Sequence, residues 1–121
     1  MTRITGPDFV ALMVRDLERA ADFYSAIGCA RTDGGPPHAV VFDTQPCAFA
    51  VREPLPFVDL DATPTPGVGV ALWLAADDAH AVARAVTDAG GTVVSDVEPG
   101  PFGDTFAFTD LDGYRVTVHD G

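Results

Sequence analysis

Aromatic and basic side chains on two predicted strands are the residues of this chain that could do chemistry. Trp73 alternates with Ala71 and Ala75 in the segment 68–75, and His119 alternates with Thr117 and Arg115 near the end of the sequence. Because successive side chains of a strand point to opposite faces, each group lies on one face of a sheet. A flat ring beside small side chains favours stacking of a planar ligand.

Four apolar residues complete the set of candidate ligand-binding side chains. Phe9 and Met13 share one face of a first strand, Phe102 lies in a turn, and Phe57 lies in a proline-rich segment. A phenylalanine in a turn is hard to explain by core packing. The alternative is that the aromatic residues fill the space between the sheets or an interface between subunits. The predicted ligand-binding set is Phe9, Met13, Phe57, Trp73, Phe102, Arg115, Thr117 and His119.

The sequence predicts no catalytic residues, and we expect neither a resident metal nor a cofactor. Cys29 and Cys47 form no CxxC or Cys/His metal pattern, and the GxSxG, GxGxxG and GxxxxGK[ST] motifs are missing. Only His119, among three histidines, falls on the face assigned to the ligand, so it is the one candidate general base. A fraying C-terminal position is the alternative interpretation of His119.

These side chains depend on a strand followed by a helix, and this unit occurs twice. In 9–28 an apolar alternation predicts the strand, Asp16 is the expected helix N-cap, and Gly28 ends the helix. An offset of 62 residues maps Asp16 onto Asp78, so the unit is an internal repeat. The buried stripes of the helices are predicted to be Leu17, Ala20, Ala21, Tyr24 and Ile27, and Ala79, Val82, Ala83, Val86 and Ala89.

The remaining segments give both halves the order βαβββ. Further strands are predicted at 29–33, 39–43 and 47–51, and at 92–96, 105–109 and 115–119, with a turn over 98–103. The strand faces that pack on the helices are predicted to hold Val10, Leu12, Val14, Val70, Leu72, Leu74, Val116 and Val118.

A proline-rich segment separates the two halves. Four prolines in 53–67 exclude a regular helix or a central strand, so this segment is a linker. With 121 residues, the chain suffices for one domain-sized core. The prediction is a single α+β domain over 1–121, with a first module at 1–52, a linker at 53–67 and a second module at 68–121.

Charge and hydropathy exclude several classes of partner. Eighteen acidic residues against seven arginines give a formal charge of -11, which opposes binding to nucleic acid and favours a cationic ligand. The alternative is that the acidity serves only solubility. No apolar run approaches the roughly 20 residues of a membrane span, and no signal peptide is evident, so we expect a cytoplasmic protein without a membrane partner.

Two segments carry a resemblance to a known family. VRDLERAADFYSAIG at 14–28 and TDLDGYRVTV at 109–118 resemble the vicinal oxygen chelate superfamily of glyoxalases, extradiol dioxygenases and bleomycin resistance proteins. PFGDTFAFTDLDGY at 101–114 is most similar to the bleomycin resistance branch. The resemblance implies two βαβββ modules in tandem, mixed sheets curled around a cleft, and a homodimer whose clefts both chains complete.

The resemblance also bears on metal binding. Metal-using members place histidine, glutamate or glutamine at positions that match Phe9, about Ala50, Ala71 and Thr117 here. One hydroxyl among apolar side chains does not supply three donors to a divalent ion. A metal-dependent glyoxalase or dioxygenase is therefore disfavoured.

The sequence thus predicts a metal-free protein that sequesters an aromatic, cationic small molecule such as a bleomycin-like antibiotic, in drug resistance or self-protection. Two alternatives stay open. One is a metal-independent isomerase or lyase of the same fold that uses His119, and the other is a structural or regulatory partner whose cleft its own side chains fill.

Overall fold

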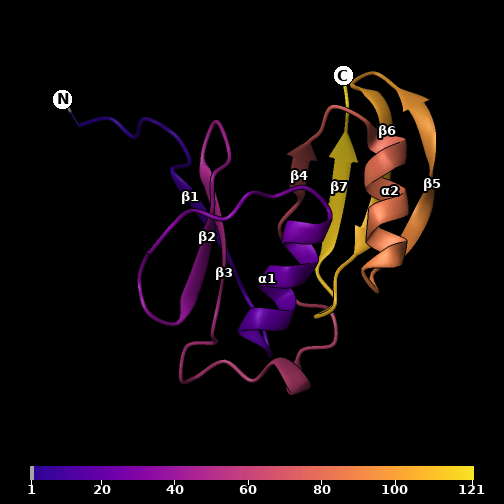
Figure 1. Cartoon of the computed structure of the whole chain (residues 1–121). Helices are drawn as coiled ribbons and strands as arrows, with labels where there is room; N and C mark the ends of the chain where they lie inside the picture. The colour runs from indigo at the N-terminus through magenta and orange to yellow at the C-terminus, as the bar shows by residue number, and fades with distance from the viewer. Residues whose placement is uncertain (1) are drawn as a thin grey trace.

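In the part of the chain that the structure describes, the fold consists of two β-sheets, two α-helices and a short 3-10 helix, and α1 lies between the sheets (Figure 1). The computed structural model describes residues 2–121. The elements are β1 (Phe9–Met13), α1 (Leu17–Ala26), β2 (Ala39–Phe42), β3 (Ala48–Arg52), the 3-10 helix η1 (Leu60–Ala62), β4 (Leu72–Ala75), α2 (Ala79–Asp88), β5 (Thr92–Gly100), β6 (Gly103–Thr109) and β7 (Arg115–His119).

Each sheet is mixed. The first has the order β1-β3-β2, with β1 parallel and β2 antiparallel to β3. The second has the order β4-β7-β6-β5, with β4 parallel to β7 and the other pairs antiparallel. The predicted α+β class with two βαβββ-like modules is confirmed. We call the face of each sheet that is turned away from the helices its open face.

Both helices begin at the predicted caps. The carboxylate of Asp16 accepts a hydrogen bond from the amide of Arg19 at 3.1 Å, and that of Asp78 accepts one from Ala81 at 3.1 Å. These bonds satisfy amide groups that have no partner inside the first helical turn. The repeat seen in the sequence is therefore a repeat of local structure.

One predicted strand is missing from the structure, and another is half as long as predicted. The segment 29–33 is not a strand, because its ladder pairing is reduced to one bridge between Arg31 and Phe42. The predicted strand over 68–75 begins only at Leu72, because the amide of Val70 closes a turn on the carbonyl of Gly67 at 2.9 Å. Val70 is therefore 77% exposed, and its assignment to the core was wrong.

The hairpin between β5 and β6 is tighter than predicted. The segment 98–103 is not a turn over its whole length, because β5 continues to Gly100 and β6 begins at Gly103. Only Pro101 and Phe102 connect the two strands. Register shifts in β5, between Val93 and Glu98, accompany this longer pairing.

One core joins both modules. It contains the aromatic residues Phe23, Tyr24, Phe42, Phe49, Phe106 and Phe108, together with aliphatic residues such as Val14, Val86, Val116 and Val118. Phe23 of α1 lies 5.9 Å from Phe108 of β6, measured between ring centroids. Within residues 2–121 no helix is long and apolar enough to cross a membrane.

Gly91 follows the end of α2 and packs closely against the ring of Phe23 in α1. A Cβ added there would lie 2.8 Å from the Phe23 ring and 2.9 Å from a methyl group of Val86. We expect Gly91→Ala to lower the free energy of unfolding by about 1 to 3 kcal/mol, because the core must shift to admit the methyl group. Urea denaturation measures it. Gly69→Ala, where nothing lies within 4 Å, is the matched control, and equal losses in both variants would contradict the packing argument.

Candidate functional site

Three aromatic rings meet at one end of the second sheet and form what we call the aromatic cluster. Trp73 lies 5.9 Å from Phe102 and 5.9 Å from His119 between ring centroids, and Phe102 lies 6.3 Å from His119. These spacings and tilted arrangements are those in which aromatic rings attract one another. Trp73 is 48% exposed and Phe102 is 56% exposed, so part of each ring remains available to a ligand.

Hydrogen bonds from the last residues hold the turn that carries Phe102. The amide of Gly121 donates to the carbonyl of Phe102 at 2.8 Å. The carboxylate of Asp120 accepts from the amides of Asp104 at 2.8 Å and Ala79 at 2.9 Å. The bond from Ala79 is the main reason that the pKa of Asp120 lies below its ordinary value. The aromatic cluster is thus supported by both β6 and α2.

A groove of about 560 Å³ opens beside the aromatic cluster, and Trp73 and His119 form part of its wall. Ligand pockets usually measure about 300 to 1,000 Å³. Both modules contribute aliphatic side chains to the lining, among them Val10, Ile27, Leu72, Leu74, Val82 and Val118. The groove therefore has the size of a small-molecule site, and its lining is mostly apolar but includes the acidic residues Asp43 and Asp77.

His119, one of the residues that line the groove, has a ring nitrogen without a hydrogen-bond partner in the described part of the chain. Its Nδ1 atom is buried and has no hydrogen-bond partner among residues 2–121. Burying such an atom without a partner costs free energy, so native structures usually provide one. The ring has the chemistry to bind a polar group or to accept a proton.

Two further predicted ligand residues lie on the same open face. Thr117 of β7 is the register partner of Trp73, and it is half-buried. Arg115, at the start of the same strand, pairs with Thr109 and is exposed. The structure therefore brings Trp73, Thr117 and His119 together, with Arg115 toward the opposite end of the strand.

The other three predicted ligand residues lie elsewhere. Phe9 begins β1 and is 51% exposed, and Met13 ends the same strand. Phe57 lies in the linker and is 84% exposed. None of the three lines the groove or joins the aromatic cluster.

Sequence reasoning missed the opposite wall of the groove. The loop 43–47 and the end of α1 form this wall, and both Cys29 and Cys47 belong to it. Burial raises the pKa of Cys29 to about 11, so its thiol is not an activated nucleophile. The two cysteines lacked a motif spacing, and no local pattern could reveal that the loop faces β4.

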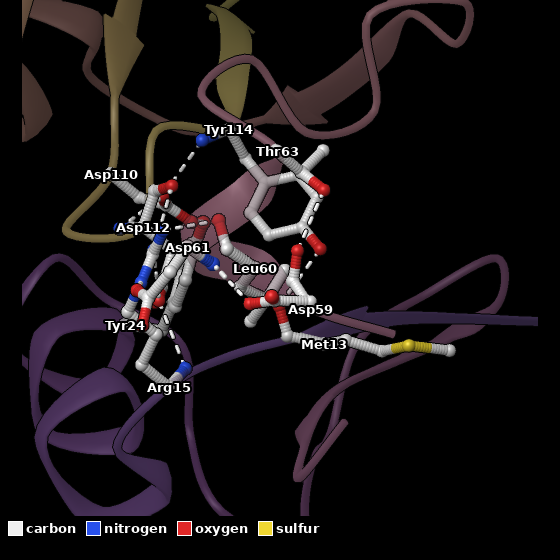
Figure 2. A network of polar contacts seen from close by, with 10 residues as sticks. All are labelled: Met13, Arg15, Tyr24, Asp59, Leu60, Asp61, Thr63, Asp110, Asp112 and Tyr114. Carbon is white, nitrogen blue, oxygen red and sulfur yellow. Dashed lines mark hydrogen bonds and ion pairs between the residues drawn. The ribbon is translucent and has the colours of Figure 1, made fainter. Parts of the chain in front are cut away.

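A polar network ties the linker to both modules (Figure 2). The guanidinium of Arg15 donates to the carboxylates of Asp61 at 2.9 Å and Asp112 at 3.1 Å, and to the carbonyl of Leu60 at 2.6 Å. The bond to Asp61 is the main reason that the pKa of Arg15 lies above its ordinary value. The hydroxyl of Tyr114 donates to the carbonyl of Met13 at 2.8 Å. These contacts fix the linker rather than form a site.

Asp110 is one of two buried carboxylates of this network, and both it and Asp112 are 8% exposed. Its oxygens accept from the amides of Asp112 at 2.9 Å and Tyr114 at 3.0 Å, and from the hydroxyl of Tyr24 at 2.6 Å. Burial raises the pKa of Asp110, although the bond from Tyr24 opposes this effect. Burial, together with the charge of Asp110, also raises the pKa of Tyr24 well above its ordinary value.

No group of three histidine, cysteine, aspartate or glutamate side chains in the described part of the chain is arranged to hold a metal ion. On the open faces, Phe9, Ala50 and Thr117 stand at three of the positions where the resemblance would place metal ligands. The donor chemistry of these side chains does not suit a divalent ion.

Comparison with known proteins places these features in a family. The family described as the Glyoxalase/Bleomycin resistance protein/Dioxygenase superfamily matches residues 6–118. A search of curated proteins found no match.

Solved structures of similar fold cover nearly the whole chain. A glyoxalase/bleomycin resistance protein from Albidiferax ferrireducens T118 is 21% identical, with a TM-score of 0.73 over 94% of this chain and 97% of its own. TnmS3, an antibiotic binding protein from Streptomyces sp. CB03234, is 21% identical, with a TM-score of 0.71 over 99% and 98%. The fosfomycin resistance protein FosX from Mesorhizobium loti is 19% identical, with a TM-score of 0.71 over 98% and 94%. At these identities the likeness shows the fold alone.

Proposed function

Because the chain belongs to the glyoxalase/bleomycin resistance protein/dioxygenase superfamily, we propose that it is a metal-free protein that binds and sequesters an aromatic small molecule in the cytoplasm. The compound is of the kind that includes bleomycin-like antibiotics, and the role is drug resistance or self-protection. The proposal takes the chain to be a binding protein rather than an enzyme.

The aromatic cluster carries this proposal. Trp73, Phe102 and His119 present partly exposed rings beside a groove of about 560 Å³. A planar ligand gains about 0.5 to 1.5 kcal/mol from each aromatic pair beyond the burial of its area. That a protein of similar fold is an antibiotic binding protein is consistent with such a use of the fold.

The ligand site is proposed to be completed by a second copy of the chain. β1 and β4 are edge strands, so their outer backbone groups have no partner in a sheet. Phe9 on the open face of the first sheet and Trp73 on that of the second are about half exposed. A homodimer that brings these faces together would place Phe9, Met13 and Phe57 of one chain near the aromatic cluster of the other.

A net charge of -11 attracts cationic compounds at long range, so a cationic aromatic ligand is the class to test first. Calorimetric titration with bleomycin, mitomycin and quinoxaline-type compounds is expected to show saturable binding to at least one of them at micromolar concentrations. No binding to any of these compounds would count heavily against the proposal.

The variant Phe102→Ala tests whether the aromatic cluster is the site. We expect its affinity for the bound compound to fall about tenfold, because one stacking contact and its buried area are lost. Calorimetry gives the affinity, and the urea midpoint should be unchanged because Phe102 is mostly exposed. Val94→Ala removes another partly exposed apolar side chain, 41% exposed on β5, and is the control; an equal loss there would place the site elsewhere.

A metal-independent isomerase or lyase is the second candidate, and His119 favours it. His119 is among the residues that line the groove, and its Nδ1 atom has no hydrogen-bond partner among residues 2–121, so this ring is the candidate general base. Conversion of the bound compound by the wild-type protein, and not by His119→Phe, would support this candidate over simple sequestration.

A further inference from the structure

The guanidinium of Arg115 belongs to the same open face as the indole of Trp73. Trp73 pairs in register with Thr117, and Arg115 precedes Thr117 by two residues, which returns it to the same face. Diagonal neighbours of this kind have backbones about 7 to 8 Å apart. The long arginine side chain therefore reaches the area in which a ring stacked on Trp73 would lie.

Among residues 2–121, no carboxylate forms an ion pair with Arg115. Along its row of the sheet, Arg115 pairs with Thr109, and Thr109 pairs with Thr92. Within residues 2–121, Arg115 makes no ion pair, whereas Arg15 and Arg31 each make two. Its charge is therefore free for a ligand.

The charge balance of the open faces is opposite in sign to that of the whole chain. The chain has 18 acidic residues and seven arginines. The register-paired positions of the open faces, by contrast, hold Arg52 and Arg115 and only one acidic residue, Glu98. Glu98 pairs with Thr105 of β6 and so belongs to the row of His119, at the far end of β7 from Arg115. The end of the face near Arg115 is cationic.

We propose that the compound bound at Trp73 carries an anionic substituent and that Arg115 binds it. This inference rests on the proposed function, because it concerns the same ligand. A guanidinium binds carboxylate, sulfonate and phosphate oxygens with two parallel hydrogen bonds, so any of these groups fits. The overall negative charge repels highly charged anions at long range, so the substituent is a single anionic group on a ring, with or without a cationic group elsewhere.

Three anthracene derivatives that differ only in one substituent test this inference. Anthracene carboxylate, anthracene methanol and aminomethyl anthracene present an anionic, a neutral and a cationic group on the same ring. Calorimetric titration of the wild-type protein is expected to show that the carboxylate binds about tenfold more tightly than the alcohol. The amine should bind no more tightly than the alcohol at moderate salt.

Variants of Arg115 locate the effect. Arg115→Gln should lower the ratio of the carboxylate affinity to the alcohol affinity to about one, and Arg115→Lys should restore part of the advantage of the carboxylate. Arg84→Gln removes the same charge from an exposed position on α2 and is the control.

The outcomes separate this inference from the proposed function. Equal affinities for the three compounds, or a carboxylate advantage that survives in Arg115→Gln, would overturn the role of Arg115 while the aromatic site stands. Tighter binding of the amine would overturn the inferred sign of the substituent. Binding of none of the three compounds would overturn the aromatic site and the inference together.

Discussion

Asp110→Ala is expected to lower the free energy of unfolding by about 3 to 5 kcal/mol, a large share of the roughly 5 to 15 kcal/mol that keeps a native domain folded. The carboxylate accepts three hydrogen bonds from Tyr24, Asp112 and Tyr114, at 2.6, 2.9 and 3.0 Å, in a place that is 8% exposed. Alanine would leave three buried donors without a partner. Urea denaturation followed by circular dichroism measures the loss.

Asp110→Asn is the matched control, because it keeps the shape and one acceptor oxygen. We expect it to cost less than alanine, since the cost of burying a charge disappears with the charge. An asparagine variant as unstable as the alanine variant would show that ionised Asp110 stabilises the fold.

The pH dependence of the stability difference between the wild type and Asp110→Asn gives an independent check. Burial raises the pKa of Asp110 in the folded protein. The folded state therefore binds the proton more tightly than the unfolded state, whose pKa is close to 3.8. The advantage of the wild type over Asp110→Asn is largest below that value and shrinks as the pH rises toward the folded pKa. An advantage that grows with pH over the same range would contradict this assignment.

Trp73→Ala is expected to weaken ligand binding by about 2 kcal/mol or more, roughly thirtyfold, which is the scale of an aromatic residue at the centre of a binding site. Trp73 is the ring that joins the aromatic cluster to the groove, since it contacts both Phe102 and His119 and also lines the groove wall. Calorimetry with the compound found to bind the wild type gives the change in affinity.

The variant should remain folded, because Trp73 lies on the edge strand β4 with 48% of its surface exposed. Val68→Ala, at a position 86% exposed before the same strand, controls for the loss of apolar surface. An affinity in Trp73→Ala equal to that of the wild type would remove the aromatic cluster from the site. Retained binding in the variant together with loss in Phe9→Ala would move the site to the first sheet.

Local patterns predicted the elements well where one local interaction decides the structure. The caps at Asp16 and Asp78 need only a carboxylate and the next turn of helix, and β7 needs only alternation over 115–119. The prediction of a strand over 29–33 was wrong because strand formation there depends on pairing with a partner strand. The backbone of this segment pairs only through one bridge at Arg31.

Phe23 shows why the core was only partly predictable. The predicted stripe of α1 ran through Tyr24 and Ile27, which suits a helix packed on one sheet. α1 lies between two sheets (Figure 1), so a second side of the helix is buried, and Phe23 on that side meets Phe108. The apolar stripe of α1 could not predict the contact between Phe23 and Phe108, because this contact forms only when the two modules pack together.

The candidate site was also predictable only in part. Residue types and alternation predicted that Trp73, Thr117 and His119 belong to one face, and the register of β4 with β7 agrees. That Phe102 reaches His119 depends on the length of β5 and on the tether from Gly121. Residues of both modules line the groove. No pattern within one segment of the sequence could therefore predict it.

The bond from Tyr114 to Met13 spans 101 positions of the chain, and the bond from Arg15 to Asp112 spans 97. A ribosome adds about 5 to 20 residues each second, so the first strand is made roughly 5 to 20 s before the residues that hold its end. During that interval the apolar face of the first sheet lacks the second module, and the end of β1 lacks its bonds to Asp112 and Tyr114. Completion of the fold therefore waits for the last turn to emerge, and a chaperone that shields the nascent first module would act in this interval.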